Sequence, residues 1–213
     1  MAKEAGILLR AFAVLAILAV FGHGHAFAEI IRISGSGCAI GTMRILGDAF
    51  RRDHPEAQFR FIPGMGTSGV VKAVLAGRLD IGLGDRPLMR AERSRGAVET
   101  RYAITPLVFG VNRFTKTEGL TLEEVAGIYG GKRDRWNDRT RIRLVLRPEE
   151  NSATVILRSM SPAIGAAVDE ALRREGMIVS VTDEDAADAI ENTPGAFGAL
   201  ALSQILSDNR DIR

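Results

Sequence analysis

The chain is poor in the features that define several protein classes. Among its 213 residues there is one cysteine, so no disulfide can form within the chain, and a disulfide-stapled fold is excluded. The 28 Lys and Arg residues barely outnumber the 26 Asp and Glu residues, which excludes a strongly polyanion-seeking protein. With 46% hydrophobic and 25% charged residues, the composition is neither collagen-like nor disordered. The length suits one large domain or two small ones.

Residues 1–28 have the pattern of a secretory signal peptide. Lys3 and Arg10 precede an uncharged apolar run at 11–21, and the sequence AFA at 26–28 supplies a cleavage site of the A-x-A type. We expect cleavage before Glu29 and a periplasmic location. The alternative is a transmembrane anchor, but a spanning helix needs about 20 apolar residues and this run is shorter.

The exported part also lacks the usual residues of catalysis and metal binding. His54 is its only histidine, no Cys and His pair is available, and no cluster along the sequence has metal-ligand spacing. We therefore expect no catalytic residues, no metal ligands and no cofactor. Cys38 is expected to be a free thiol packed at the start of a helix, and Trp136 to be a core residue.

Short apolar runs alternate with amphipathic stretches along the exported chain. This alternation predicts β-α-β units with parallel or mixed sheets, arranged as two α/β lobes at 29–105 and 106–213 that join near 104–108. Capping signals at Thr121, Ser161 and Thr182 predict three helix starts. The predicted strands are 30–33, 59–61, 79–83, 142–146, 179–181 and 195–200, with an extended run at 102–111, and the predicted helices are 41–53, 70–75, 121–129, 152–160, 162–174 and one after 182.

Three turns rich in glycine, serine and threonine join a predicted strand to a predicted helix. They are SGSGCA at 34–39, GMGTSG at 64–69 and NSAT at 151–154. The first N–H groups of a helix have no partner within the helix, and the helix dipole adds positive charge there. Glycine lets a ligand approach the backbone, and hydroxyl groups add hydrogen bonds. Each turn is therefore a candidate anion cradle.

The middle turn also fits the dinucleotide-binding pattern G-x-G-x-x-G, with Asp80 and Asp85 downstream. An NAD-dependent enzyme is therefore an alternative. Against it, the match lies in the second β-α unit, and a soluble nicotinamide cofactor is not expected outside the cytoplasm.

Two charged residues lie beside these turns. Arg147 ends a predicted strand before the third turn, where a guanidinium could hold an oxyanion with two hydrogen bonds. Asp85 follows the third predicted strand, and its carboxylate could accept a hydrogen bond from protonated phosphate while rejecting sulfate. The alternative is a surface Asp85 paired with Arg86, and spacing alone favours that alternative.

The sequence resembles the periplasmic phosphate-binding proteins of ABC transporters, which are PstS-like and have the type II periplasmic-binding-protein fold. The resemblance implies a bilobed α/β protein, with mixed sheets flanked by helices, that closes on one anion. It covers essentially the whole exported chain. Its segments are GSG (35–37), GMGTSGVVKAV (64–74), DIGLGDRPL (80–88), LTLEEVAGIYGGKRDRW (120–136), LVLRPEENSAT (144–154) and PGAFG (194–198).

By position, the resemblance implies several ligand-binding residues. Thr67 would donate its hydroxyl and its amide, with Ser68 beside it. Asp85 would accept the proton of the ligand, and Arg147 would supply positive charge.

Two further groups of ligand-binding residues follow from the same resemblance. Ser152 and Thr154 would donate from the second lobe, although the segment 147–154 is one residue longer than the family pattern and lacks its central glycine. Ala39 stands where the family usually has Ser or Thr. The first turn would therefore contribute only the backbone N–H groups of Ala39 and Ile40.

The function that the resemblance implies is an extracytoplasmic solute-binding protein that captures phosphate or a related oxyanion. Its expected partners are that anion and the membrane subunits of an ABC transporter, with no nucleic acid, and we expect a monomer. The alternatives are a binder of another oxyanion or of an organic acid, and a sensory or scaffold module with a degenerate pocket. The chain ends near the point where the family's chain returns to the first lobe, so the C-terminal part of that lobe is expected to be missing.

Overall fold

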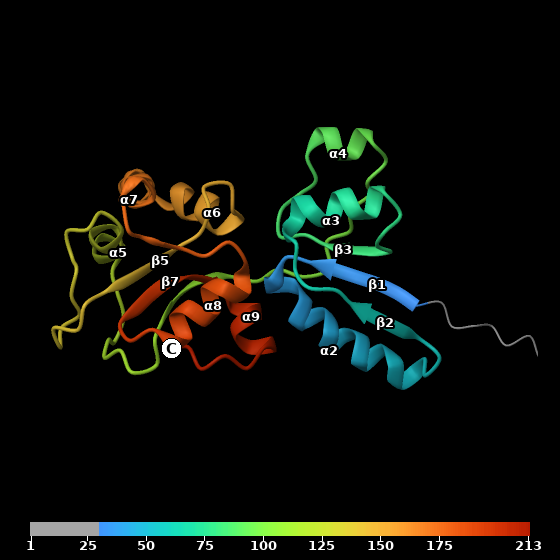
Figure 1. Ribbon diagram of the computed structural model, residues 1–213, viewed down its shortest axis with the longest axis horizontal. Helices are drawn as coiled ribbons and strands as arrows, with labels where there is room; N and C mark the ends of the chain where they lie inside the picture. The colour runs from blue at the N-terminus through green and yellow to red at the C-terminus, as the bar shows by residue number, and fades with distance from the viewer. Residues whose placement is uncertain (1–29) are drawn as a thin grey trace, which may run out of the picture.

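The computed structural model describes residues 30–213, and the predicted signal peptide lies outside them. The described chain forms two sheets, each with helices on both faces, placed side by side (Figure 1). Within residues 30–213, no helix combines the length and the apolar character that crossing a membrane requires. A mixed α/β architecture with flanked sheets was predicted from the sequence and is confirmed.

The first lobe is a parallel sheet with helices on both faces. Its elements are β1 (Ile30–Gly35), α2 (Gly37–Asp53), β2 (Gln58–Phe61), α3 (Gly66–Leu75), β3 (Ile81–Leu83) and α4 (Arg90–Ser94). The strand order is β2-β1-β3, with Ile33 paired to Phe61 on one side and to Ile81 on the other. Because α2 and α3 lead to strands on opposite sides of β1, they lie on opposite faces of the sheet (Figure 1).

The second lobe is a mixed sheet with more helices around it. Its elements are β4 (Leu107–Val111), α5 (Leu122–Tyr129), β5 (Arg143–Leu146), α6 (Ser152–Met160), α7 (Pro162–Arg173), β6 (Ile178–Val179), α8 (Asp183–Asn192), β7 (Ala196–Ala201) and α9 (Leu202–Ser207). The strand order is β4-β7-β5-β6, and only the β4-β7 pair is antiparallel.

The two faces of the second sheet are buried in different clusters. Leu144 and Leu146 pack with α5, α6 and α7, while Val145 between them packs with Ile190 of α8, as strand alternation requires. Trp136 is 3% exposed within the larger cluster, and its ring N–H donates to the carbonyl of Gly195 at 3.0 Å. The prediction that Trp136 is a core residue is confirmed.

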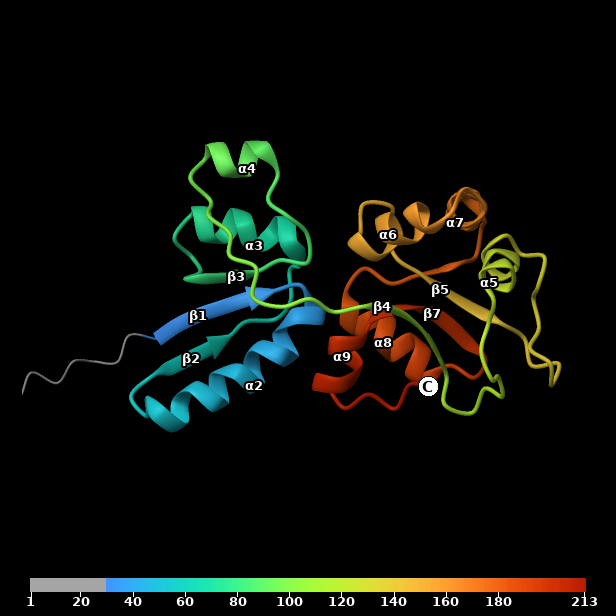
Figure 2. The same ribbon diagram turned by 180° about the vertical axis from the view of Figure 1, so that it is seen from behind.

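The lobes meet where α2 packs against α9. A Cβ atom on Gly41 would lie 2.2 Å from the side-chain oxygens of Ser207 and Asp208, so the two helices come close because residue 41 has no side chain. The hydroxyl of Ser203 donates to the carbonyl of Cys38 at 2.8 Å. The chain passes between the lobes in the segment from α4 to β4, which runs behind the sheets in Figure 1 and in front in Figure 2. The division into lobes at residue 105 stays a prediction.

The predicted capping signals are confirmed. Thr121 accepts a hydrogen bond from the Glu124 amide, Ser161 from the Ile164 amide, and Thr182 from the Asp185 amide. Each interaction satisfies an N–H group in the first turn of a helix. The capping residue and its partner lie three positions apart, so the sequence itself indicates where these helices begin.

Two helices begin earlier than predicted. Helix α2 begins at Gly37 instead of 41, because Ser36 has an extended conformation at the N-cap and the glycine-rich residues form the first turn. Helix α3 begins at Gly66 instead of 70, and the φ of +66° at Gly66 lets the chain turn directly into the helix. The predicted extended run at 102–111 is a strand only from Leu107 to Val111.

Candidate functional site

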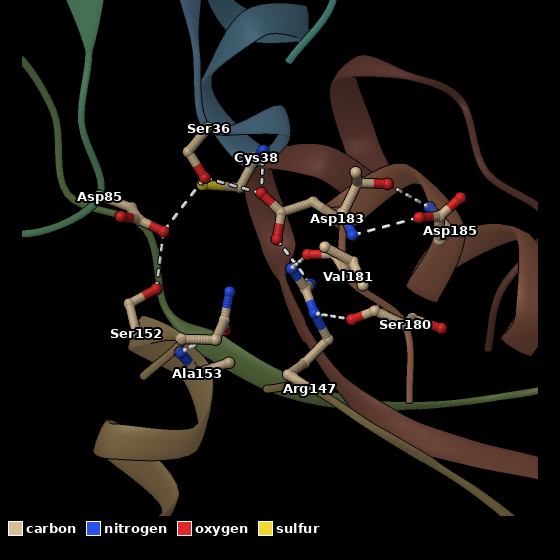
Figure 3. A network of polar contacts seen from close by, with 12 residues as sticks. Ser36, Cys38, Asp85, Arg147, Ser152, Ala153, Ser180, Val181, Asp183 and Asp185 are labelled. Atoms are coloured by element: carbon tan, nitrogen blue, oxygen red, sulfur yellow. Dashed lines mark hydrogen bonds and ion pairs between the residues drawn. The ribbon is translucent and has the colours of Figure 1, made fainter. Parts of the chain in front are cut away.

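Hydroxyl groups from both lobes converge on the carboxylate of Asp85 (Figure 3). Its Oδ2 atom lies 3.0 Å from the hydroxyl oxygen of Ser36 and accepts from the hydroxyl of Ser152 at 2.6 Å. The Thr67 hydroxyl donates to Oδ1, and the Asp85 amide donates to the Thr67 oxygen at 3.1 Å. Because Ser152 begins α6 of the second lobe, Asp85 links the two lobes.

The fold explains why these groups lie together. Strands β1 and β3 of the first sheet and β5 of the second sheet end at this point, and ligands of α/β proteins bind at the carboxyl ends of parallel strands. A Cβ atom on Gly35 would lie 2.4 Å from the Cβ of Leu83, so only glycine allows β1 and β3 to approach so closely. Ser36 follows β1 directly, and Asp85 lies two residues after the end of β3.

Arg147 lies just after β5 and is buried, with 6% of its side chain exposed. Its Nε donates to the carbonyl of Ser180 at 2.9 Å, and its Nη2 donates to the carbonyl of Val181 at 3.2 Å. Its Nη1 forms an ion pair with Oδ1 of Asp183 at 2.6 Å. All three guanidinium nitrogens therefore have acceptors within the protein.

Asp183, the first residue of α8, takes part in this network and was missed by the sequence analysis. Its Oδ2 accepts from the Cys38 amide at 2.9 Å and from the Ser36 hydroxyl at 2.7 Å (Figure 3). The capping motif at Thr182 predicts the helix start but gives no sign of these contacts. Ser36 and Asp183 are 147 residues apart, and a sequence pattern cannot show such a contact.

The charges of the site act on two titratable groups. Burial opposes ionisation of Asp183, but the charge of Arg147 and the hydrogen bonds from Ser36 and Cys38 hold the pKa of this carboxyl below its usual value. Burial and the Asp183 charge raise the pKa of the Cys38 thiol to about 12. Asp183 is therefore ionised and Cys38 protonated at neutral pH, so Cys38 is not poised as a nucleophile.

The fold also creates a cluster that sequence spacing did not indicate. Ligand atoms of Cys38, Asp85 and Asp183 all lie within 4.8 Å of one another, a spacing that could hold a metal ion. The charges around the cluster do not favour a cation, because Asp183 is already paired with the buried guanidinium of Arg147. The N-terminus of α2 adds further positive charge.

Other residues predicted to bind the ligand contact protein groups. The Ala39 amide donates to the Ser36 carbonyl at 3.0 Å, and Ile40 is 5% exposed in the core. The buried Thr154 hydroxyl donates to the carbonyl of Arg147 at 3.2 Å. In the first turn of α2, the amide that reaches the polar network is that of Cys38.

The alternative pairing of Asp85 with Arg86 is wrong. Arg86 forms its ion pair with Glu92 at 2.8 Å and donates to the hydroxyl of Ser68 at 3.0 Å. Ser68, predicted to lie beside the ligand, therefore contacts Arg86, and Asp85 turns toward the hydroxyls of the network.

Comparison with known families gives one match that spans most of the chain. Residues 22–211 match the profile of the PBP superfamily domain. Two curated relatives, both the phosphate-binding protein PstS 2 of Streptococcus agalactiae (serotype V and serotype III strains), are 26% identical over 106 residues. That alignment covers 50% of this chain and 36% of the relatives, so the match spans about a third of their length.

Solved structures share the fold at low sequence identity. A candidate phosphate ABC transporter substrate-binding protein from Clostridium perfringens, solved with bound phosphate, is 20% identical with a TM-score of 0.66; the match covers 82% of this chain and 71% of that one. The reduced regulatory domain of OxyR2 from Vibrio vulnificus is 12% identical with a TM-score of 0.53, covering 88% and 79%. The predicted periplasmic-binding-protein fold is confirmed, and it occurs in proteins of more than one kind.

Proposed function

Because the chain belongs to the PBP superfamily, we propose that it binds a small oxyanion, inorganic phosphate, between its two lobes and delivers it to the membrane subunits of an ABC transporter. The proposal involves no covalent step. The predicted signal peptide supports a periplasmic location, and a monomer is sufficient because both lobes come from one chain.

The observation that carries the proposal is the convergence of oxyanion-binding groups from both lobes. Ser36 and Thr67 come from the first lobe, and Ser152 and Arg147 from the second. Each of the three hydroxyl residues lies at the N-terminus of a helix, where backbone N–H groups and the helix dipole favour negative charge. A guanidinium adds full positive charge and a planar donor set for an oxyanion.

The carboxylate of Asp85 favours phosphate as the ligand over a fully ionised anion such as sulfate. A carboxylate among hydroxyl donors repels sulfate but accepts a hydrogen bond from an oxyanion that keeps a proton, as phosphate does at neutral pH. The names of the matched relatives, a phosphate-binding protein and a phosphate transporter component, agree with this choice.

The proposal is tested by titration calorimetry of the exported protein, stripped of bound ligand, with phosphate, sulfate, molybdate and citrate. Heat with phosphate alone supports the proposal. Heat with a different anion would assign the site to that ligand instead.

A second candidate function is a sensory or scaffold module that keeps the fold without transporting an anion. One observation favours it: all three nitrogens of Arg147 donate to protein acceptors, so the main cation of the site is already paired. The fold is also that of the OxyR2 regulatory domain. The absence of heat with all four anions would support this candidate.

A further inference from the structure

We propose that Asp183 is an internal competitor of the ligand: its carboxylate takes the donors of the oxyanion position, and phosphate binds by displacing it. This inference rests on the proposed function and adds an affinity-setting residue to the same site. It assigns Asp183 a role that the resemblance did not imply.

The first argument is the donor set of Asp183. Its two carboxylate oxygens accept from a backbone N–H in the first turn of α2, from the hydroxyl of Ser36 and from the guanidinium of Arg147. A helix N-terminus, a hydroxyl and a guanidinium are the groups that bind phosphate in proteins. The donors come from both lobes, so the side chain of Asp183 bridges the lobes as a bound anion would (Figure 3).

The second argument is charge. Asp183 and Arg147 form a buried ion pair, with 12% and 6% of their side chains exposed. An added phosphate would therefore meet a guanidinium that is already neutralised, together with the carboxylates of Asp183 and Asp85. Moving the Asp183 carboxylate away releases the charge of Arg147 and removes one of the two repulsions.

The third argument is that the Ser36 hydroxyl has one hydrogen for two carboxylates. The Ser36 hydroxyl lies 2.7 Å from Asp183 and 3.0 Å from Asp85, but it has one hydrogen and can donate to only one of them. The other carboxylate then faces a hydroxyl lone pair. A protonated phosphate in place of the Asp183 carboxylate brings its own hydrogen to Asp85, and the conflict disappears.

Asp183 can leave without unfolding its helix. The start of α8 is held by Thr182 and Asp185, which cap the helix through reciprocal side-chain and backbone hydrogen bonds. Rotation of the Asp183 side chain alone therefore moves the carboxylate, and the backbone keeps its place. Asp185 also provides a matched control, because it lies in the same helical turn and forms its hydrogen bonds with Thr182.

The test compares phosphate binding by the wild-type protein, Asp183→Asn and Asp185→Asn. If the carboxylate fills the oxyanion position in about nine of ten molecules, its removal raises phosphate affinity about tenfold, and Asp185→Asn changes it little. An affinity of Asp183→Asn equal to or weaker than wild type, while wild type binds phosphate, would overturn the inference.

Labelling of Cys38 with a thiol reagent gives a readout that does not depend on phosphate. Asp183 accepts from the Cys38 amide and its charge raises the pKa of the thiol, so Asp183→Asn should label faster than Asp185→Asn. If labelling is faster but neither protein binds phosphate, sulfate, molybdate or citrate, the proposed function is rejected, whereas the contact that Asp183 makes between the lobes is supported. Unchanged labelling would contradict that contact.

Removing one partner of a buried ion pair can also destabilise the fold. If Asp183→Asn is unfolded by circular dichroism, we expect phosphate, or formate as a free carboxylate, to restore its structure by taking the same donors. A variant that neither anion restores would count against the inference.

Discussion

We expect discrimination between phosphate and sulfate to depend on the side chain of Asp85. Asp85→Asn replaces an acceptor by an amide that can donate, so phosphate loses the acceptor for its proton and sulfate loses a repulsion. A hydrogen bond to a charged group contributes roughly 1.5–3 kcal/mol, so we expect the ratio of phosphate to sulfate affinity to fall about ten- to a hundredfold. Calorimetry with both anions measures the ratio.

Asp80 supplies the control for this substitution. It lies in the same segment of the first lobe and pairs with Arg32 at 2.8 Å, with both side chains more than a third exposed. Asp80→Asn should leave the affinity ratio unchanged. An unaltered ratio in Asp85→Asn would remove Asp85 from the ligand site.

The pH dependence of stability follows from Asp183. Its pKa is lower in the folded protein than in the unfolded chain, so its contribution is complete above the unfolded value of about 3.9 and is lost as pH falls through the folded pKa. We expect the free energy of unfolding in urea to fall more steeply below about pH 4 in the wild type than in Asp183→Asn. Parallel pH profiles for the two proteins would show that Asp183 does not form an ion pair with Arg147.

Packing between helices makes a separate prediction at Gly41. A methyl group there would overlap the side-chain oxygens of Ser207 and Asp208, whereas the helical Gly127 of α5 has only the Cβ of Arg133 near it, at 3.8 Å. We expect Gly41→Ala to destabilise the protein by about 1–3 kcal/mol, the usual cost of overpacking. Gly127→Ala should instead stabilise by about 0.5–1 kcal/mol, because alanine favours a helix.

Urea unfolding monitored by circular dichroism measures both glycine substitutions. Equal effects of the two substitutions would show that the α2–α9 contact is looser than the close approach at Gly41 indicates.

Elements set by local chemistry were predictable from the sequence, and contacts between elements were not. The helix starting after Thr121 could be predicted because its capping partner Glu124 lies three residues away. Helix α2 was predicted four residues late, because Ser36 and Gly37 suit a ligand turn as well as a helix start. In the site, Asp85 and Arg147 were indicated by their positions beside the glycine-rich turns, and the resemblance implied the roles of Thr67 and Ser152. The position of Asp183 depends on a contact between lobes, for which no local signal exists.

The two lobes differ in how much apolar surface they bury. The compact cluster of the first lobe contains Ile33, Ala39, Ile40 and Leu83, and the outer part of α2 leaves Ile45 and Phe50 about half exposed. The second lobe buries two larger clusters, one on each face of its sheet. Since burial of apolar surface is the main stabilising contribution, the first lobe depends more on its contacts with the second.

Native-state hydrogen exchange tests this dependence. We expect the amides of β1, β2 and the C-terminal half of α2 to exchange faster than those of β5 and β7, because fewer buried contacts must be broken to open them. In the N-terminal turn of α2, the Cys38 amide should be protected, since it donates to Asp183. Asp183→Asn should therefore increase exchange in that turn and leave β5 and β7 unchanged. Equal exchange in both lobes would mean that the small cluster around Ile33 is sufficient to hold the first lobe.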